Sequence, residues 1–238
     1  QTAGALHALF GLLVDDGNGF LRALRAAAAS PGAPVPAVNV TIYEPAYGIV
    51  ADPAKWAVDT RQSADHSLVY ILARAMRRAV GEAGEAGEAG EAALGGRAED
   101  AWRRLMLGPE DYGPAALADP LTRQLMQNMT IEHGGDDFDQ KYPEGIPTSV
   151  SVALREGAAT TTLDSGLVLF PPGHCRYAGT AGEDPQAVTE GLLREKHRLL
   201  LGDDDHATSD ALVARFRGLG TMSSDELDNI HNLDLSTI

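Results

Sequence analysis

The most regular pattern in the chain is an apolar face with helical spacing, preceded by the polar residues 61–66. The apolar positions share one face over about five turns. They are Leu68, Ile71, Leu72, Ala75, Met76 and Ala79. Ser63 is a natural N-cap, so we expect Asp65 and His66 in the first helical turn. There the helix dipole favours an ionised carboxylate and a neutral imidazole, and such a pair can accept a proton. The alternative is that Asp65 merely suits the dipole and His66 merely caps the helix.

Other segments repeat this spacing or replace it with strict alternation. Helices are predicted for residues 3–29 with a break at 15–19, for 99–107, from 120, for 185–201 and 209–216, and after a capping box at 223–226. Alternation predicts strands at 37–43, 129–133, 148–154 and 161–170, the last two forming a hairpin. Residues 47–60 and 134–147 are predicted loops, and the prolines of 30–36 indicate a linker. The middle of the chain is therefore predicted to be α+β, with helical segments on both sides.

Composition and charge narrow the classes of protein that the chain can belong to. The formal net charge of −15 over 238 residues argues against a nucleic acid or an anionic membrane as partner. It does not exclude an anionic substrate, because a few arginines and histidines can dominate one cleft. The one cysteine, Cys175, excludes disulfides and cysteine-based metal centres within this chain. No apolar run has the length of a membrane span and no secretory signal opens the chain, so we expect a cytoplasmic protein.

Polar groups with chemical potential gather at three places. These are Arg61, Asp65 and His66; His133 with Lys141, Tyr142 and Glu144; and His174 with Arg176. Each has a structural alternative, since strand-end histidines and exposed charges commonly have no chemistry. The histidines show no metal-binding spacing, so no metal site is predicted. The Gly-Glu-Ala repeat at 81–92 is predicted to be an acidic surface insertion without chemistry.

Five short motifs occur in a fixed order along the chain. They are Tyr-Glu-Pro-Ala-Tyr at 43–47, Asp-Pro-Ala-Lys-Trp at 52–56, Arg-Gln-Ser-Ala-Asp-His-Ser at 61–67, Tyr-Pro-Glu-Gly-Ile-Pro at 142–147 and Phe-Pro-Pro-Gly-His-Cys-Arg at 170–176. Together they resemble the MmgE/PrpD family, which includes 2-methylcitrate dehydratase, cis-aconitate decarboxylase and an iminodisuccinate epimerase. The similarity extends from about Ala37 to the C-terminus.

The resemblance implies a two-domain architecture. Residues 1–36 would be the end of a helical domain and a linker, 37–178 an α+β lid domain with antiparallel strands, and 179–238 helices that return to the helical domain. The active site would lie between the domains. Family members act without metal or organic cofactor and are typically dimers. The family's N-terminal half is not part of this sequence, so we expect a fragment or a split enzyme that forms a homodimer or a heteromer with an N-terminal-half chain.

The resemblance also implies a chemistry, the β-elimination of water from a citrate-like di- or tricarboxylic acid. Asp65 or His66 could be the base, and His174 or Tyr142 the acid. Arg61, Arg176 and Lys141 could bind the carboxylates of the substrate. We expect the Asp65–His66 pair to face His174 and Arg176 across one cavity. The alternatives are a decarboxylase or epimerase of a similar acid, or a non-catalytic subunit that binds carboxylates or regulates a partner.

Overall fold

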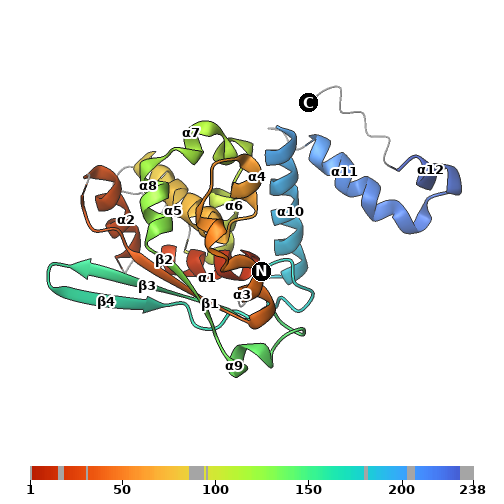
Figure 1. Ribbon diagram of the computed structural model, residues 1–238. Coiled ribbons are helices and arrows are strands. Elements are labelled where there is room, and N and C mark those ends of the chain that lie inside the picture. Colours follow the sequence, from red (N-terminus) through yellow and green to blue (C-terminus); the bar gives the residue numbers. More distant parts are fainter. Residues whose placement is uncertain are drawn as a thin grey trace. The chain divides into compact units, whose positions relative to one another are not determined.

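The computed structural model describes residues 2–15, 19–30, 32–85, 94, 96–179, 182–202 and 207–230. The chain divides into two compact units, Gln1–Pro185 and Gln186–Ile238. The first unit contains both the predicted segment 1–36 and the predicted domain 37–178. It is a mixed α+β structure in which helices pack against a four-stranded sheet (Figure 1).

The sheet of the first unit is mixed, with the strand order β2-β1-β3-β4. The strands are β1 (Ala37–Ile42), β2 (Met129–His133), β3 (Thr148–Glu156) and β4 (Ala159–Asp164). The β1–β3 and β3–β4 pairs are antiparallel, as predicted, and β3–β4 is the predicted hairpin. The β1–β2 pair is parallel, because the helices between the two strands return the chain to the same edge of the sheet. The predicted second strand of the hairpin is too long, since beyond Asp164 only Val168 pairs, in an isolated bridge with Thr148.

The first unit contains more helices than the sequence predicted. They are α1 (Thr2–Leu13), α2 (Phe20–Ala29), α3 (Glu44–Val50), α4 (Arg61–Asp65), α5 (Leu68–Glu85), α6 (Ala98–Leu105), α7 (Pro114–Leu117), α8 (Pro120–Gln127) and α9 (Asp136–Asp139), with 3₁₀ turns at Pro53–Trp56 and Pro109–Tyr112. The loops predicted at 47–60 and 134–147 are therefore partly helical. The α3 helix forms because Pro45 lies in its first turn, where proline is tolerated, and Glu44 suits the positive end of the dipole.

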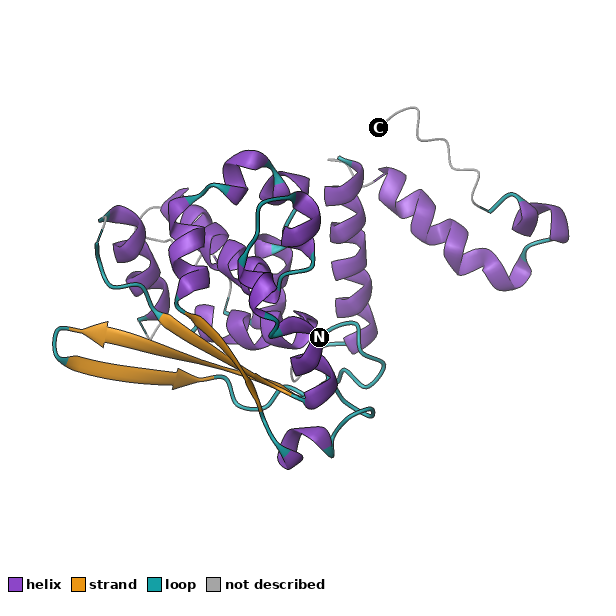
Figure 2. Cartoon of the chain, in the orientation of Figure 1, coloured by secondary structure: helices purple, strands orange, loops and turns teal. Residues whose placement is uncertain are grey.

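One face of the sheet and one face of α5 make the core. Val38, Val40 and Ile42 of β1 are almost fully buried. The predicted apolar positions of α5 are buried too, except Ile71, which is half-buried. The α1 and α2 helices pack against β3, and most helices of the first unit lie along one side of the sheet, while α9 lies apart beyond the end of β2 and the β3–β4 hairpin extends past the helices (Figure 2). The opposite face is polar, and Thr130 of β2 donates a hydrogen bond to Asn39 of β1.

The second unit consists of α10 (Pro185–Leu201), α11 (Ala207–Arg217) and α12 (Ser224–Asp228). These helices confirm the prediction for the end of the chain, including the capping box formed by Ser223 and Glu226. An ion pair of 2.7 Å between Arg194 and Asp210 links α10 to α11. Of the predicted 81–92 insertion, the first residues continue α5 to Glu85, and 86–92 lie outside the described residues. No helix within the described ranges is long and apolar enough to cross a membrane.

Candidate functional site

Three of the five sequence motifs meet at one edge of the sheet, where β1 and β2 end and β3 begins. The motif at 43–47 follows β1 directly, and the motif at 142–147 leads into β3. The rings of Tyr43 and Tyr142 stack with their centroids 4.6 Å apart and their planes 17° apart. The backbone N–H of Glu44 donates a 2.7 Å hydrogen bond to Asp139 of α9. The motif at 170–176 lies against the same loop, since a side chain at Gly145 would come within 3.2 Å of the Phe170 ring.

His133, the last residue of β2, lies between two carboxylates at this edge. Its Nε2 is 2.9 Å from Asp139 Oδ2, and its Nδ1 is 3.5 Å from Glu44 Oε2. The ring of Tyr47 lies 6.0 Å from the imidazole. The pKa of Asp139 is lowered below its usual value, mainly by the hydrogen bond from the Glu44 N–H and to a smaller extent by the contact with His133. This arrangement fixes the imidazole and keeps an anion beside it, which is suited to holding a proton or orienting a polar ligand.

Asp139 was not a candidate from the sequence, where His133 was grouped with Lys141, Tyr142 and Glu144. The only signal for it was its position in an acidic loop close to His133. Of that group, the Lys141 ammonium donates to the backbone carbonyl of Asp137 instead, and Glu144 pairs with Arg176. Tyr142 is 43% exposed.

The turn that carries His174 and Arg176 is fixed by its own backbone. The His174 N–H donates to the Pro171 carbonyl at 3.0 Å, and the Arg176 N–H donates to His174 Nδ1 at 3.1 Å. Nδ1 is therefore an acceptor, and a neutral His174 carries its proton on Nε2. Arg176 forms a 2.8 Å ion pair with Glu144, and its guanidinium lies 5.9 Å from the centre of the Phe170 ring. The structure thus brings the second and third predicted groups of polar residues together.

Tyr177 anchors the end of this turn in a buried polar cluster. Its hydroxyl donates to the carboxylate of Glu99 on α6, which is 3% exposed. The Tyr177 ring meets the edge of His7 on α1 at a centroid distance of 6.1 Å. His7 Nδ1 accepts a 3.2 Å hydrogen bond from Trp102 Nε1, and burial lowers the pKa of His7. The ring contact with His7 and the hydrogen bond to Glu99 therefore hold the end of the turn against α1 and α6.

The first predicted group, Arg61, Asp65 and His66, lies on α4, and here the predicted helix start is wrong. Thr60, not Ser63, is the N-cap, and Ser63 completes the capping box at the third helical position. The α4 helix ends at Asp65 with His66 as its C-cap, and α5 starts separately at Leu68. Asp65 and His66 are thus at the carboxyl end of a short helix, where the expected stabilisation of a neutral imidazole does not apply.

His66 makes two local contacts that favour its protonated form. Its Nδ1 contacts Asp65 Oδ1, and it lies 2.9 Å from the carbonyl oxygen of Gln62. The pKa of His66 is raised above its usual value. The largest cause is the side-chain hydrogen bond with Asp65, and the hydrogen bond with the Gln62 carbonyl and the charge of Asp65 add to it. These contacts act against the expected neutral imidazole, because they favour the protonated form of His66 beside the Asp65 carboxylate.

We expect His66 to titrate above the ordinary histidine value of about 6.5 in an NMR pH titration. Asp65→Asn should lower that pKa, because it removes the largest cause of the shift. The stabilisation of the folded protein by the Asp65–His66 pair is fully present below the unfolded-state pKa of His66. It is lost as the pH rises through the folded-state pKa of His66. Lys55→Gln is the control, since Lys55 acts in the opposite sense and its removal should raise the pKa slightly. A His66 pKa that is the same in Asp65→Asn and the parent protein would contradict the pairing.

The structure describes no direct link between this pair and the sheet-edge residues. Among the described residues, no hydrogen bond, ion pair or ring contact joins Asp65 or His66 to His174 or Arg176. The α4 helix packs instead against α5 and the 3₁₀ turn Pro109–Tyr112. A shared cavity that contains both groups stays a prediction, as do the substrate-binding roles of Arg61, Arg176 and Lys141.

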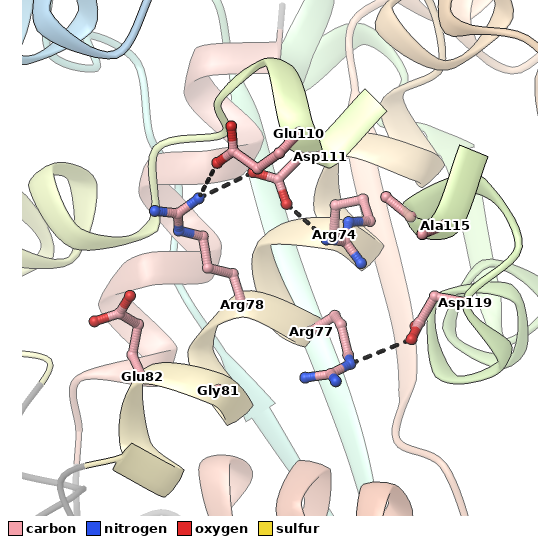
Figure 3. Close-up of a pocket in the computed structure, with 10 residues that line it drawn as sticks. Arg74, Arg77, Arg78, Gly81, Glu82, Glu110, Asp111, Ala115 and Asp119 are labelled. Atoms are coloured by element: carbon pink, nitrogen blue, oxygen red, sulfur yellow. Dashed lines mark hydrogen bonds and ion pairs between the residues drawn. The ribbon is translucent and has the colours of Figure 1, made fainter. Parts of the chain in front are cut away.

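A separate pocket of about 400 Å³ lies along the polar face of α5 (Figure 3). Three arginines of that helix line it, Arg74, Arg77 and Arg78. The rest of the lining is Gly81, Glu82, Glu110, Asp111, Ala115, Ala116 and Asp119. None of these is a residue that the sequence analysis proposed as a site. The signal that could have found it is the i, i+3, i+4 spacing of the arginines, which places them on one helical face.

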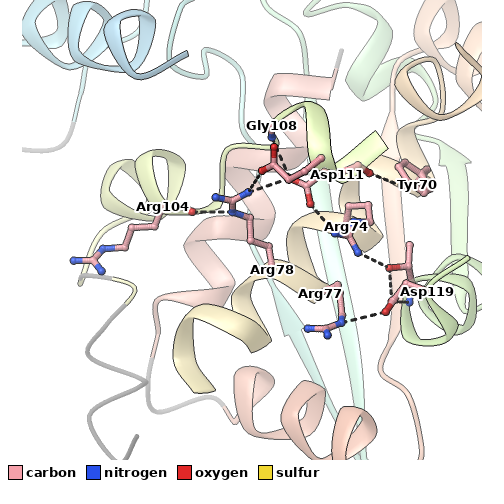
Figure 4. A network of polar contacts seen from close by, with 10 residues as sticks. Tyr70, Arg74, Arg77, Arg78, Arg104, Gly108, Asp111 and Asp119 are labelled. Atoms are coloured by element: carbon pink, nitrogen blue, oxygen red, sulfur yellow. Dashed lines mark hydrogen bonds and ion pairs between the residues drawn. The ribbon is translucent and has the colours of Figure 1, made fainter. Parts of the chain in front are cut away.

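Asp111 is the centre of the polar network beneath this pocket (Figure 4). Its side chain is 4% exposed and accepts hydrogen bonds from Arg74 at 2.6 Å and from Arg78 at 3.0 Å. The Gly108 N–H donates a third, at 3.0 Å. The Asp111 backbone carbonyl accepts from the Tyr70 hydroxyl at 2.6 Å. One buried carboxylate therefore sets the positions of two guanidinium groups.

Asp119, the N-cap of α8, holds the third arginine more loosely. It accepts hydrogen bonds from the Thr122 N–H at 2.8 Å and hydroxyl at 2.7 Å, while Arg77 Nε is 3.4 Å away. Burial acts to raise the pKa of Asp119, but the Thr122 hydrogen bonds and the charges of Arg77 and Arg74 outweigh it, so the pKa is lowered. Asp119 is therefore ionised at neutral pH, with Oδ1 held by Thr122 and Oδ2 facing Arg77.

In the part of the chain that the structure describes, no group of three or more His, Cys, Asp or Glu residues is placed to hold a metal ion. The geometry offers two candidate sites, the motif residues at the sheet edge and the arginine-lined pocket of α5, while the Asp65–His66 pair lies on α4 without a described contact to either. Comparisons with protein-family models and with curated proteins found no match for this chain.

Proposed function

We propose that the chain is the lid and C-terminal part of an MmgE/PrpD-type lyase, a cofactor-independent dehydratase of a citrate-like di- or tricarboxylic acid in the cytoplasm. Its assembly would be a homodimer or a heteromer with a chain that supplies the N-terminal half. The observation that carries the proposal is the set of five motifs in order, three of which converge at one edge of the sheet. The mixed α+β fold is compatible with the expected lid.

The residues suit an elimination of water. A base removes the proton from the carbon next to a carboxylate, the C–H electron pair forms the double bond, and the hydroxyl leaves as water after an acid protonates it. His174 can donate from Nε2, because its Nδ1 accepts the Arg176 N–H. His66 can be the base only after it has lost its proton to solvent. Arg176, with 55% of its side chain exposed, is accessible to a substrate carboxylate that replaces Glu144.

Product analysis tests the proposal. The complete natural protein is incubated with citrate, 2-methylcitrate, cis-aconitate and aspartate-derived acids, and the products are followed by ¹H NMR. We expect an alkene product from a hydroxy acid, or the reverse hydration. Loss of CO₂ without hydration or dehydration would show a decarboxylase, inversion of a stereocentre would show an epimerase, and either result would remove the dehydratase assignment.

A non-catalytic carboxylate-binding or regulatory subunit is the second candidate. It is favoured by the exposure of the proposed site residues, since 67% of the His66 side chain and 55% of the Arg176 side chain are open to solvent. Enzyme sites usually exclude water from such groups. Co-purification separates the two candidates, because a split enzyme should bring down a helical partner that restores turnover. A chain that binds carboxylates but gains no activity with any partner would favour the subunit.

A further inference from the structure

The α5 pocket contains hydrogen-bond donors that nothing in the described structure uses. Arg74 Nε is buried and has no hydrogen-bond partner. The other two nitrogens of this guanidinium are held by Asp111 and, at 3.4 Å, by Thr122. A buried donor without an acceptor destabilises the folded protein, unless water or a ligand supplies the acceptor.

Arg77 offers further donors at the same place. Only its Nε has a described contact, the 3.4 Å approach to Asp119, and neither terminal nitrogen has one. The guanidinium lies over Gly81, where a Cβ would be 3.9 Å from Nη1, so no side chain stands between it and the pocket. Figure 3 shows the terminal nitrogens of Arg77 pointing away from Asp119. Arg77 is therefore the arginine of this pocket with the most capacity for a new partner.

Three of the four acids that line the pocket already have partners. Asp111 accepts from two arginines and the Gly108 N–H. Asp119 uses Oδ1 for both Thr122 bonds, and its Oδ2 makes the 3.4 Å contact with Arg77 Nε. In all, three guanidinium groups and four carboxylates line the pocket, and Glu110 is 66% exposed, so solvent and salt screen its charge.

We propose that this pocket is a binding site for a small oxyanion, a carboxylate or a phosphate, whose oxygens accept from the terminal nitrogens of Arg77. Ala115 and Ala116 form an apolar wall beside this position. A guanidinium with free N–H groups is the side chain best matched to such anions. The inference goes beyond the proposed function and does not depend on it, because no pocket residue belongs to the motifs.

The test is a titration of the purified protein with inorganic phosphate and, separately, with acetate, followed by calorimetry and by the arginine Nε–H signals in ¹H–¹⁵N spectra. We expect saturable binding that moves the Arg77 Nε–H signal. Arg77→Gln should weaken binding about tenfold or more, since it removes a charge-assisted contact. Binding of phosphate alone or acetate alone identifies which oxyanion the site takes.

Two variants keep the test decisive. Arg155→Gln removes the same charge from an exposed arginine outside this pocket and should change the affinity less than twofold. Glu82→Gln removes a lining carboxylate that has no described partner, and should strengthen oxyanion binding about two- to fivefold. Absence of binding at tens of millimolar, equal losses in Arg77→Gln and Arg155→Gln, or weaker binding in Glu82→Gln would each overturn the proposal. The last result would indicate a cationic or zwitterionic ligand.

Discussion

Asp111→Ala is expected to lower the free energy of unfolding by about 3–5 kcal/mol, the usual cost of removing one partner of a buried ion pair. The carboxylate is 4% exposed, and the Arg74 side chain opposite it is 14% exposed. Its removal leaves Arg74 with an uncompensated charge, deprives Arg78 of one of its acceptors, and leaves the Gly108 N–H without its acceptor. Urea denaturation followed by circular dichroism measures the effect.

Glu110→Ala is the matched control for this prediction. Glu110 is the preceding residue and also contacts Arg78, at 3.2 Å, but 66% of its side chain is exposed. An exposed ion pair contributes about 1 kcal/mol or less, so this variant should unfold at nearly the same urea concentration as the parent protein. Similar losses in both variants would show that burial does not set the strength of this network, and that Asp111 is not its centre.

His66→Ala is expected to lower the turnover of the complete enzyme by about two to four orders of magnitude, the usual range for one acid–base group. The loss should appear in kcat, since the proposal gives His66 a proton rather than a carboxylate to bind. Because Asp65 raises the pKa of His66, the parent enzyme should gain activity as the pH rises through that pKa and the base form appears. Arg176→Ala should instead raise KM and lower the rate.

Gln62→Ala serves as the control for His66→Ala. Gln62 lies on the same short helix, and its described contact with His66 is made through the backbone carbonyl, which alanine retains. Its rate should therefore match that of the parent enzyme. Circular dichroism should show that both variants are folded. If His66→Ala keeps full activity, the proton transfer belongs to Asp65 or to residues outside this chain, and the pH dependence would have another origin.

Local periodicity was enough to predict the elements that make the core. The apolar face of α5 is visible in the sequence because one helical face must be buried, and Leu72, Ala75 and Met76 are indeed fully buried. The β3–β4 hairpin follows from alternation with a turn at Gly157, which adopts a φ of 62°. In these segments the local sequence pattern and the packing in the folded protein favour the same secondary structure.

Features that depend on segments far apart in the sequence could not be predicted in this way. Two residues three positions apart, Thr60 and Ser63, both suit an N-cap, and only the break before α5 shows which one acts. The contact of His133 with Asp139 depends on where α9 lies, and the α5 pocket depends on the turn that brings Asp111 to the arginines. The parallel pairing of β1 and β2 likewise depends on the path of the intervening helices.

That parallel pair has a consequence for how the protein is made. Asn39 and Thr130, neighbours in the finished sheet, are 91 positions apart, and β3 follows later still. A ribosome adding about 5–20 residues per second needs roughly 5–20 s to reach β2 after β1 has been synthesised. During that interval Val38, Val40 and Ile42 have neither neighbouring strand to cover them. Newly made chains should therefore depend on chaperones, and refolding in vitro should be slow and sensitive to protein concentration.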